Sequence, residues 1–178
     1  MISEKNMMHG VDYLNEDVTG WLVSEKLDGC RAYWDGDTMW SRGGKVIDIP
    51  DNMRAALPAG VALDGEIHAG RTGFEIARRA VQYGTWHDQI EFSAFDAPLH
   101  PGTFADRYTF IEYLLPFEGI VNFIHHEDRG DIVEALFFMR EIQVCYGGEG
   151  VVLRDPTNLY RAGRTDQVLK LKHAPEQL

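Results

Sequence analysis

The sequence predicts an α+β fold in which antiparallel β-sheets are flanked by helices. Eight short runs have the alternation and the β-branched or aromatic content of strands, and turn signals such as Asp35-Gly36 separate them. Three stretches with helical periodicity, and a shorter fourth one, lie between these runs. Because the chain has no internal repeat, low-complexity tract or linker, we expect residues 1–178 to form a single domain.

The expected strands are short and end at turn residues. In chain order they cover residues 20–27, 30–34, 38–42, 61–68, 90–98, 120–126, 150–155 and 167–172. Residues 51–57 predict a short helix, and residues 74–84 predict a longer one with apolar side chains on one side. Thr103 and Asp131 are expected to cap helices over 103–115 and 131–144. The last helix is so apolar that we expect most of it to be buried.

The 178-residue chain has a formal net charge of −11, which excludes a generic nucleic-acid-binding protein. The charge is uneven, however, because cations outnumber acids from Gly150 onward. The cations are Arg154, Arg161, Arg164, Lys170 and Lys172, against the acids Asp155, Asp166 and Glu176. A local basic face can therefore meet phosphates while the rest of the chain repels them.

The sequence favours a location in the cytoplasm and no association with membranes. No apolar run approaches the length of a membrane span, and the N-terminal residues lack an apolar signal region. Two cysteines, Cys30 and Cys145, do not make a disulfide framework, so a reducing interior is expected.

Five predicted strand ends carry charged residues next to glycines or apolar partners. They are SEKLDGCR (24–31), SRGGK (41–45), LDGEI (63–67), GGEGVVLR (147–154) and VLKLK (168–172). One such stretch is equally typical of an edge strand protected by charge. Five of them in one short chain favour a binding site.

The charged residues in these stretches suit the chemistry of a nucleoside triphosphate. The candidates for phosphate or sugar oxygens are Lys170, Lys172, Arg31 and Arg42, and those for a divalent cation or ribose hydroxyls are Glu66 and Glu149. A lysine held among other cations and near a metal can act as a nucleophile, and Lys26 is the candidate for this role. The expected reaction is attack at phosphorus.

The order EKLDGCR, SRGG, LDGEI, EFSAFD, GEGVVLR and LKLK resembles nucleotidyltransferase motifs I, Ia, III, IIIa, IV and V of ATP-dependent DNA ligases, especially the small bacterial and viral enzymes. The resemblance runs from about Val23 to Lys172. It implies an ATP-grasp-like nucleotidyltransferase (adenylation) domain that uses ATP with Mg²⁺, or with Mn²⁺ as the alternative, and acts on nicked duplex DNA. Lys26 would hold AMP as a phosphoramidate and pass it to the 5′-phosphate, before the 3′-hydroxyl displaces it.

The resemblance also implies a role for each matching residue. The residues at ATP or AMP would be Glu25, Lys26, Arg31, Glu66, Phe95, Glu149, Lys170 and Lys172; Glu66 and Glu149 would bind the metal, and Arg42 and Arg164 would face DNA or phosphate. Among these, Phe95 would stack on adenine, and Glu66 with Arg31 would hold the ribose. We expect no chemistry from Cys30 or from the adjacent His125 and His126.

The chain departs from the resemblance at its end. Ligases of this kind continue past motif V into an OB-fold domain that carries motif VI, whereas this chain stops at HAPEQL, six residues after Lys172. We therefore expect a monomeric adenylation domain without an OB-fold domain, whose activation by ATP is slow or depends on a partner protein or domain. Two alternatives stay open: an RNA ligase or mRNA-capping guanylyltransferase of the same superfamily, and a non-catalytic module that binds nicks or nucleotides.

Overall fold

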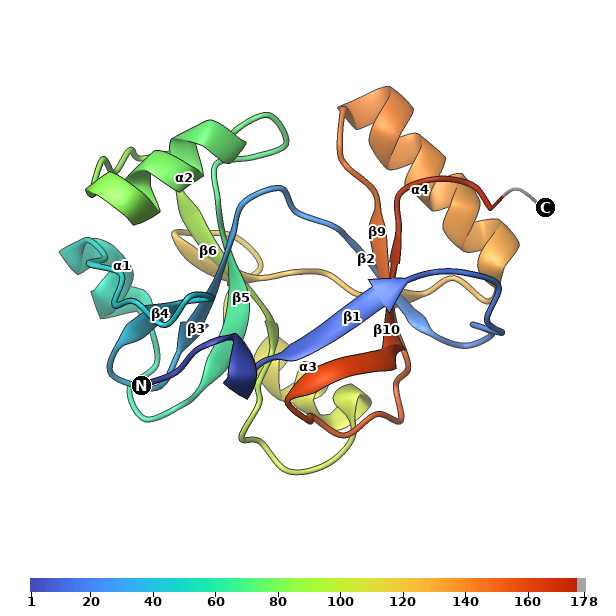
Figure 1. Cartoon of the computed structure of the whole chain (residues 1–178), viewed down its shortest axis with the longest axis horizontal. Helices are drawn as coiled ribbons and strands as arrows, with labels where there is room; N and C mark the ends of the chain where they lie inside the picture. The colour runs from blue at the N-terminus through green and yellow to red at the C-terminus, as the bar shows by residue number, and fades with distance from the viewer. Residues whose placement is uncertain (176–178) are drawn as a thin grey trace.

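The computed structural model describes residues 1–175, which form two five-stranded sheets lying side by side (Figure 1). The first sheet has the strand order β1 (Met8–Asp12), β10 (Gly163–Leu171), β9 (Val151–Arg154), β2 (Leu22–Glu25) and β8 (Glu127–Asp128). The second has the order β4 (Met39–Ser41), β3 (Cys30–Trp34), β5 (Leu63–His68), β6 (Glu91–Asp96) and β7 (Val121–Phe123). The helices are α1 (Asp51–Ala56), α2 (Phe74–Tyr83), α3 (Phe104–Leu114) and α4 (Ile132–Tyr146), with a short 3₁₀ turn over Glu4–Asn6.

The predicted α+β class is confirmed, and each predicted strand and helix is present. Two strands were missed, and two pairings are parallel where antiparallel pairs were expected: β1 with β10, and β6 with β7. β1 was missed because His9, Gly10 and Asp12 break the apolar alternation of a strand, and β8 because it has only two residues. Glu176 and the end of the HAPEQL stretch lie outside the described residues.

Both predicted helix caps are present. Thr103 accepts a hydrogen bond from the Asp106 N–H through its hydroxyl, and Asp131 accepts one from the Val133 N–H at 2.9 Å. Within residues 1–175, no helix combines the length and the apolar composition needed to cross a bilayer.

The prediction that the helix at 131–144 is mostly buried is wrong. Ala135, Met139 and Ile142 are buried on one face of α4, but Phe137 is 67% exposed and Val144 is 71% exposed. Residues 131–144 contain enough apolar side chains for both faces, whereas the structure places a sheet against only one of them. Composition alone does not tell which face of a helix has a partner.

Each sheet has its own hydrophobic core. The second sheet buries Leu63, Ile67 and Phe92 together with residues of the first three helices. The first sheet buries Val23 and Leu153, among others, against α4. In Figure 1, α1 and α2 lie beside the second sheet and α4 lies beside the first.

The KLDG segment, Lys26–Gly29, carries the chain from the first sheet to the second, since it joins β2 to β3. Lys26 therefore follows a strand and does not lie inside one, and its N–H donates to the Gly150 carbonyl at 2.9 Å. A Cβ on Gly29 would lie 2.2 Å from the Ile67 carbonyl oxygen. Glycine is required there because β5 passes close to the backbone.

A buried polar network connects the second sheet to the loop between β9 and β10 of the first sheet. Arg107 on α3 is fully buried and donates to Asp96 on β6 at 2.7 Å and 3.2 Å. The same guanidinium donates to the side chain and the carbonyl of Asn158, in the loop between β9 and β10, at 2.7 Å and 3.0 Å. The network fixes that loop against the second sheet.

Candidate active site

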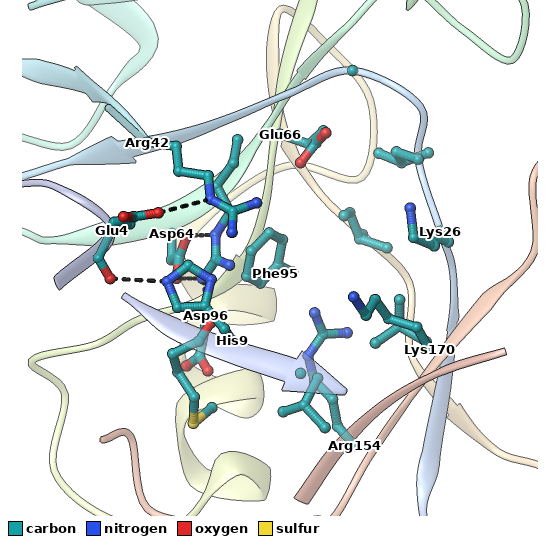
Figure 2. Close-up of a pocket in the computed structure, with 18 of the residues that line it drawn as sticks. Glu4, His9, Lys26, Arg42, Asp64, Glu66, Phe95, Asp96, Arg154 and Lys170 are labelled. Carbon is teal, nitrogen blue, oxygen red and sulfur yellow. Dashed lines mark hydrogen bonds and ion pairs between the residues drawn. The ribbon is translucent and has the colours of Figure 1, made fainter. Parts of the chain in front are cut away.

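A cavity of about 970 Å³ lies between the two sheets, which is a typical volume for a small-molecule site. Its lining includes every predicted site residue except Glu149: Glu25, Lys26, Arg31, Arg42, Glu66, Phe95, Arg164, Lys170 and Lys172. Figure 2 shows the Lys26 and Lys170 side chains on one side of this space, with Glu66 above it and Phe95 opposite the two lysines. Residues that lie far apart in the sequence, such as Lys26 and Lys172 with 146 positions between their numbers, thus meet at one site.

Glu149 lies against the lysines that line the cavity. Lys26 Nζ donates to both Glu149 carboxylate oxygens at 3.0 Å, and Lys172 Nζ lies 2.5 Å from Oε1. Burial acts to raise the pKa of Glu149, but the hydrogen bonds from Lys172 and Lys26 outweigh it and lower that pKa. Glu149 is therefore a carboxylate that holds two ammonium groups at the position of the predicted nucleophile.

Glu66 and Arg31 occupy paired positions on β5 and β3. Burial raises the pKa of Glu66 to about 7, although the nearby charges of Arg31 and Lys26 oppose the shift. The Arg31 guanidinium forms a bidentate ion pair with Asp64, to which Nε and Nη2 donate at 2.9 Å and 2.6 Å. The guanidinium is therefore fixed in orientation before any ligand binds.

Asp64 and Tyr160 hold Arg31 in place, and the sequence did not predict this role for either residue. The Tyr160 hydroxyl donates to Asp64 Oδ2 at 2.6 Å and accepts from the Met8 N–H at 3.1 Å. Arg31 Nη2 also donates to the Met8 carbonyl at 2.7 Å, which closes a ring of hydrogen bonds. Tyr160 could not be found from a local pattern because its partners, Met8 and Asp64, come from β1 and β5.

Phe95 faces the cavity between two guanidinium groups. Its ring centroid lies 5.2 Å from Arg31 Cζ and 4.8 Å from Arg154 Cζ. Arg154 is the last residue of the predicted motif IV, but no role was assigned to it. Arg154 is buried and donates to the Ser24 hydroxyl at 3.0 Å. It therefore links Phe95 to β2, the strand that precedes Lys26.

His126 also supports Arg154. Arg154 can only donate, so His126 Nε2 accepts at 3.0 Å and Nδ1–H donates to the Ile124 carbonyl at 2.8 Å. Burial and the Arg154 charge lower the pKa of His126 well below its ordinary value. The ring is therefore neutral at physiological pH, as Arg154 requires.

Basic side chains surround the opposite end of the cavity. Arg164 on β10 pairs in register with His9 on β1, and Arg42 lies beyond them in a turn. Figure 2 shows Arg42 beside Glu4, whose carboxylate lies 3.5 Å from Arg42 Nε. Arg42 is 61% exposed, so it can exchange this ion pair for a phosphate. His9 was not predicted, because β1 itself was missed.

The Glu25 carboxylate has a partner outside the predicted motifs. Arg71, in the loop after β5, donates to Glu25 through Nε at 2.8 Å and Nη2 at 2.9 Å. The Arg71 guanidinium also lies 5.0 Å from the centroid of the Tyr146 ring on α4. The side chain of Glu25 thus connects the two sheets next to Lys26.

The carboxylates of the site suit a metal ion that is coordinated mainly by substrate phosphates and water. They do not form a metal centre made of protein ligands alone. Among residues 1–175, no group of three or more His, Cys, Asp or Glu side chains could hold a metal ion. Mg²⁺ commonly uses only one or two carboxylates together with water and substrate phosphates. Glu149 is ionised and fits this requirement, whereas the raised pKa of Glu66 suits a hydrogen bond to a hydroxyl.

Comparisons with known proteins agree with the motifs. No protein-family model matches the chain. The chain is 31% identical over 169 residues to a DNA ligase of Haemophilus influenzae; the alignment covers 91% of this chain and 61% of that protein. The chain therefore spans about three fifths of the length of this curated relative.

Solved structures of DNA ligases share the fold. A Lig E DNA ligase matches with a TM-score of 0.84 and 26% identity, over 94% of this chain and 68% of that chain. The Chlorella virus DNA ligase-adenylate matches with a TM-score of 0.73 and 24% identity, again over 94% of this chain and 68% of the other. The six motifs thus gather around one cavity, and the chain is similar in sequence to a DNA ligase and shares the fold of solved DNA ligases.

Proposed function

We propose that this chain catalyses ATP-dependent joining of the 3′-hydroxyl and the 5′-phosphate at nicks in duplex DNA, through a covalent lysyl-AMP intermediate. The observation that carries the proposal is the position of Lys26. Its amine lies in a cavity that also contains an aromatic ring for a base, a carboxyl group for ribose, and further lysines for phosphate. The relatives support the substrates, since one is a DNA ligase and another is a ligase-adenylate. Residues 1–178 are proposed to act as one monomeric adenylation domain in the cytoplasm.

The first chemical step would modify Lys26. The uncharged amine attacks the α-phosphorus of ATP, the Nζ–P bond forms, and the bond to the β-phosphate oxygen breaks so that pyrophosphate leaves. The nitrogen gives up one proton to water and becomes the phosphoramidate. Phe95 would stack on adenine, Glu66 with Arg31 would hold the ribose, and Lys170 with Lys172 would bind phosphate oxygens. Fixed charges of this kind stabilise a phosphoryl-transfer transition state without covalent chemistry of their own.

Glu149 connects this step to a divalent cation. In the structure its carboxylate accepts two hydrogen bonds from Lys26 Nζ, so the amine points at Glu149. We propose that Glu149 would hold Mg²⁺ or Mn²⁺, which would supply positive charge to the phosphate oxygens. A Glu149 carboxylate engaged in this way would release the Lys26 amine for attack. Glu66 remains a second candidate ligand.

The DNA would lie across the basic end of the cavity. AMP passes from Lys26 to the 5′-phosphate, and the 3′-hydroxyl then attacks that phosphorus and releases AMP. Arg42 and Arg164 are the proposed phosphate contacts, and His9 lies beside Arg164. Few contacts and an acidic body predict weak binding with a shallow salt dependence, of about −0.9 in the log–log slope per contacted phosphate.

The test is a sealing assay with a nicked duplex that already carries AMP on its 5′-phosphate. We expect sealing without added ATP, and we expect the unactivated nick to be sealed only with ATP and a divalent cation. GTP in place of ATP, and a nick in RNA, test the capping-enzyme and RNA-ligase alternatives. Failure to seal the activated nick at any salt concentration, despite formation of the lysyl-AMP adduct, would contradict the proposal for DNA.

Replacing Phe95 by alanine should raise the apparent ATP requirement more than it slows the chemical step. A stacked ring contributes nearly equally to the ground state and the transition state, by roughly 1–3 kcal/mol, or about 5- to 150-fold in half-saturating ATP. The measurement is an ATP titration of adduct formation beside a thermal melt. Phe92→Ala is the matched control, because Phe92 points into the core from the same strand and its loss should mainly lower the melting temperature. A Phe95→Ala protein that melts lower with an unchanged ATP requirement would contradict the stacking role.

Glu66 should make stability depend on pH. Its ordinary pKa is 4.5 and its folded pKa is about 7, so the neutral carboxyl stabilises the fold fully below about pH 4.5 and this contribution is lost as pH rises through 7. Glu66→Gln stays neutral, so its stability relative to the wild type should rise between pH 5 and pH 8 by on the order of 1–3 kcal/mol. Urea unfolding at several pH values measures this. Glu141→Gln, on the exposed face of α4, should show no such trend, and a pH-independent difference for Glu66→Gln would contradict the buried carboxyl.

A further inference from the structure

Gln143 is a polar residue next to the buried face of α4. Ala135 and Met139 pack from this helix onto the first sheet, Ile142 is buried on the same face, and the Gln143 side chain reaches the end of that sheet. Polar groups in such positions reduce stability unless their hydrogen bonds are satisfied. The partners of Gln143 therefore show what the residue does.

Both hydrogens of the Gln143 carboxamide go to backbone carbonyls at the open end of the β9–β10 ladder. Nε2 donates to the Glu149 carbonyl at 2.9 Å and to the Lys172 carbonyl at 2.7 Å. The paired residues of the ladder end at Val151 and Leu171, so these carbonyls lie just beyond the last pair. Since both partners can only accept, the amide nitrogen must face them. One side chain thus bridges two chain segments that the sheet no longer holds together.

The two bridged residues are the ones whose side chains surround the nucleophile. Glu149 holds Lys26 Nζ at 3.0 Å, and Lys172 Nζ lies 2.5 Å from the same carboxylate. A shift of either backbone segment would move a charged group relative to Lys26, and displacements near 1 Å can slow catalysis by about 10²-fold. We propose that Gln143 is a positioning residue for adenylylation of Lys26. This inference rests on the proposed function, because it assigns a role within that reaction.

The test compares Gln143→Glu and Gln143→Met with the wild type. Glutamate keeps the shape but places an acceptor against two acceptors, and methionine keeps a similar length without a donor. At saturating ATP, the single-turnover rate of lysyl-AMP formation should fall about 10- to 100-fold. Losses of this size are typical for residues that hold the directly acting side chains in their orientation. Half-saturating ATP should change less than about threefold, because no contact to the nucleotide is removed. Gln82→Glu, on the exposed surface of α2, is the control with the same charge change and should match the wild type.

A purely structural role would lower the melting temperature and leave the rate per folded molecule unchanged, so a wild-type rate in both folded variants would overturn the proposal. Hydrogen–deuterium exchange gives a readout that does not need activity: amides around 149–152 and 171–172 should exchange faster in the variants. Unchanged exchange there would also overturn it. If the wild type itself forms no adduct, the proposed function fails, whereas the exchange result still decides whether Gln143 holds these segments.

Discussion

Lys26→Ala is expected to form no protein–AMP adduct while the protein stays folded. The side chain is 21% exposed, lies in the cavity and belongs to neither hydrophobic core, so its loss removes a nucleophile and little packing. Removal of a nucleophile from a covalent mechanism costs several orders of magnitude in rate, on the order of 10⁶ in a well-studied hydrolase. Lys26→Arg should fail as well, because a guanidinium is not deprotonated near neutral pH. The measurement is labelling with α-labelled ATP beside a thermal melt.

Lys45→Ala is the matched control for this change. Lys45 is an exposed lysine that follows the turn after β4, and it does not line the cavity. Its variant should be labelled like the wild type. Adduct of wild-type yield in Lys26→Ala would contradict the assignment of the nucleophile, whatever the behaviour of the control.

Arg107→Ala is expected to have the largest effect on stability. Arg107 and Asp96 are both buried, and removing the guanidinium leaves a buried carboxylate without its partner. Such a change typically costs about 3–5 kcal/mol of unfolding free energy. It also removes the hydrogen bonds that hold Asn158 and the loop before β10. Urea unfolding followed by circular dichroism should show a large drop in the midpoint.

Arg78→Ala provides the comparison for a surface ion pair. Arg78 pairs with Glu75 on the exposed side of α2, where solvent screens the charges, so its loss should change the urea midpoint little. If Arg107→Ala unfolds at the same urea concentration as Arg78→Ala, the buried network does not hold the two sheets together.

Local patterns predicted most of the fold. The helix at 103–115 has an unambiguous cap at Thr103, and the strand at 30–34 was predicted with its observed bounds. β1 could not be found in the same way, since it gains its partner only when β10, more than 150 residues later, pairs with it. The exposed face of α4 was mispredicted because hydrophobicity does not reveal how many layers a fold has.

The residues of the candidate site also differ in whether a local pattern reveals them. Lys26, Glu66, Glu149 and Lys170 fall in short motifs at strand ends, so the sequence displays them directly. Other residues have functions only through contacts that the tertiary structure creates: Tyr160 with Asp64, Arg154 with Phe95, Arg71 with Glu25, and Gln143 with the carbonyls of Glu149 and Lys172. Sequence spacing carries no signal for these pairs, because their members come from different strands, helices and loops.

The lysyl-AMP intermediate is tested most directly by the mass of the protein after incubation with ATP and Mg²⁺, followed by peptide mapping of the modified site. We expect addition of one AMP group, on the peptide that contains Lys26, with loss of the adduct in acid and none formed when the divalent cation is chelated. An AMP group on Lys170 or Lys172 with Lys26 unmodified would contradict the proposal that Lys26 is the nucleophile, as would the absence of any adduct from the folded protein.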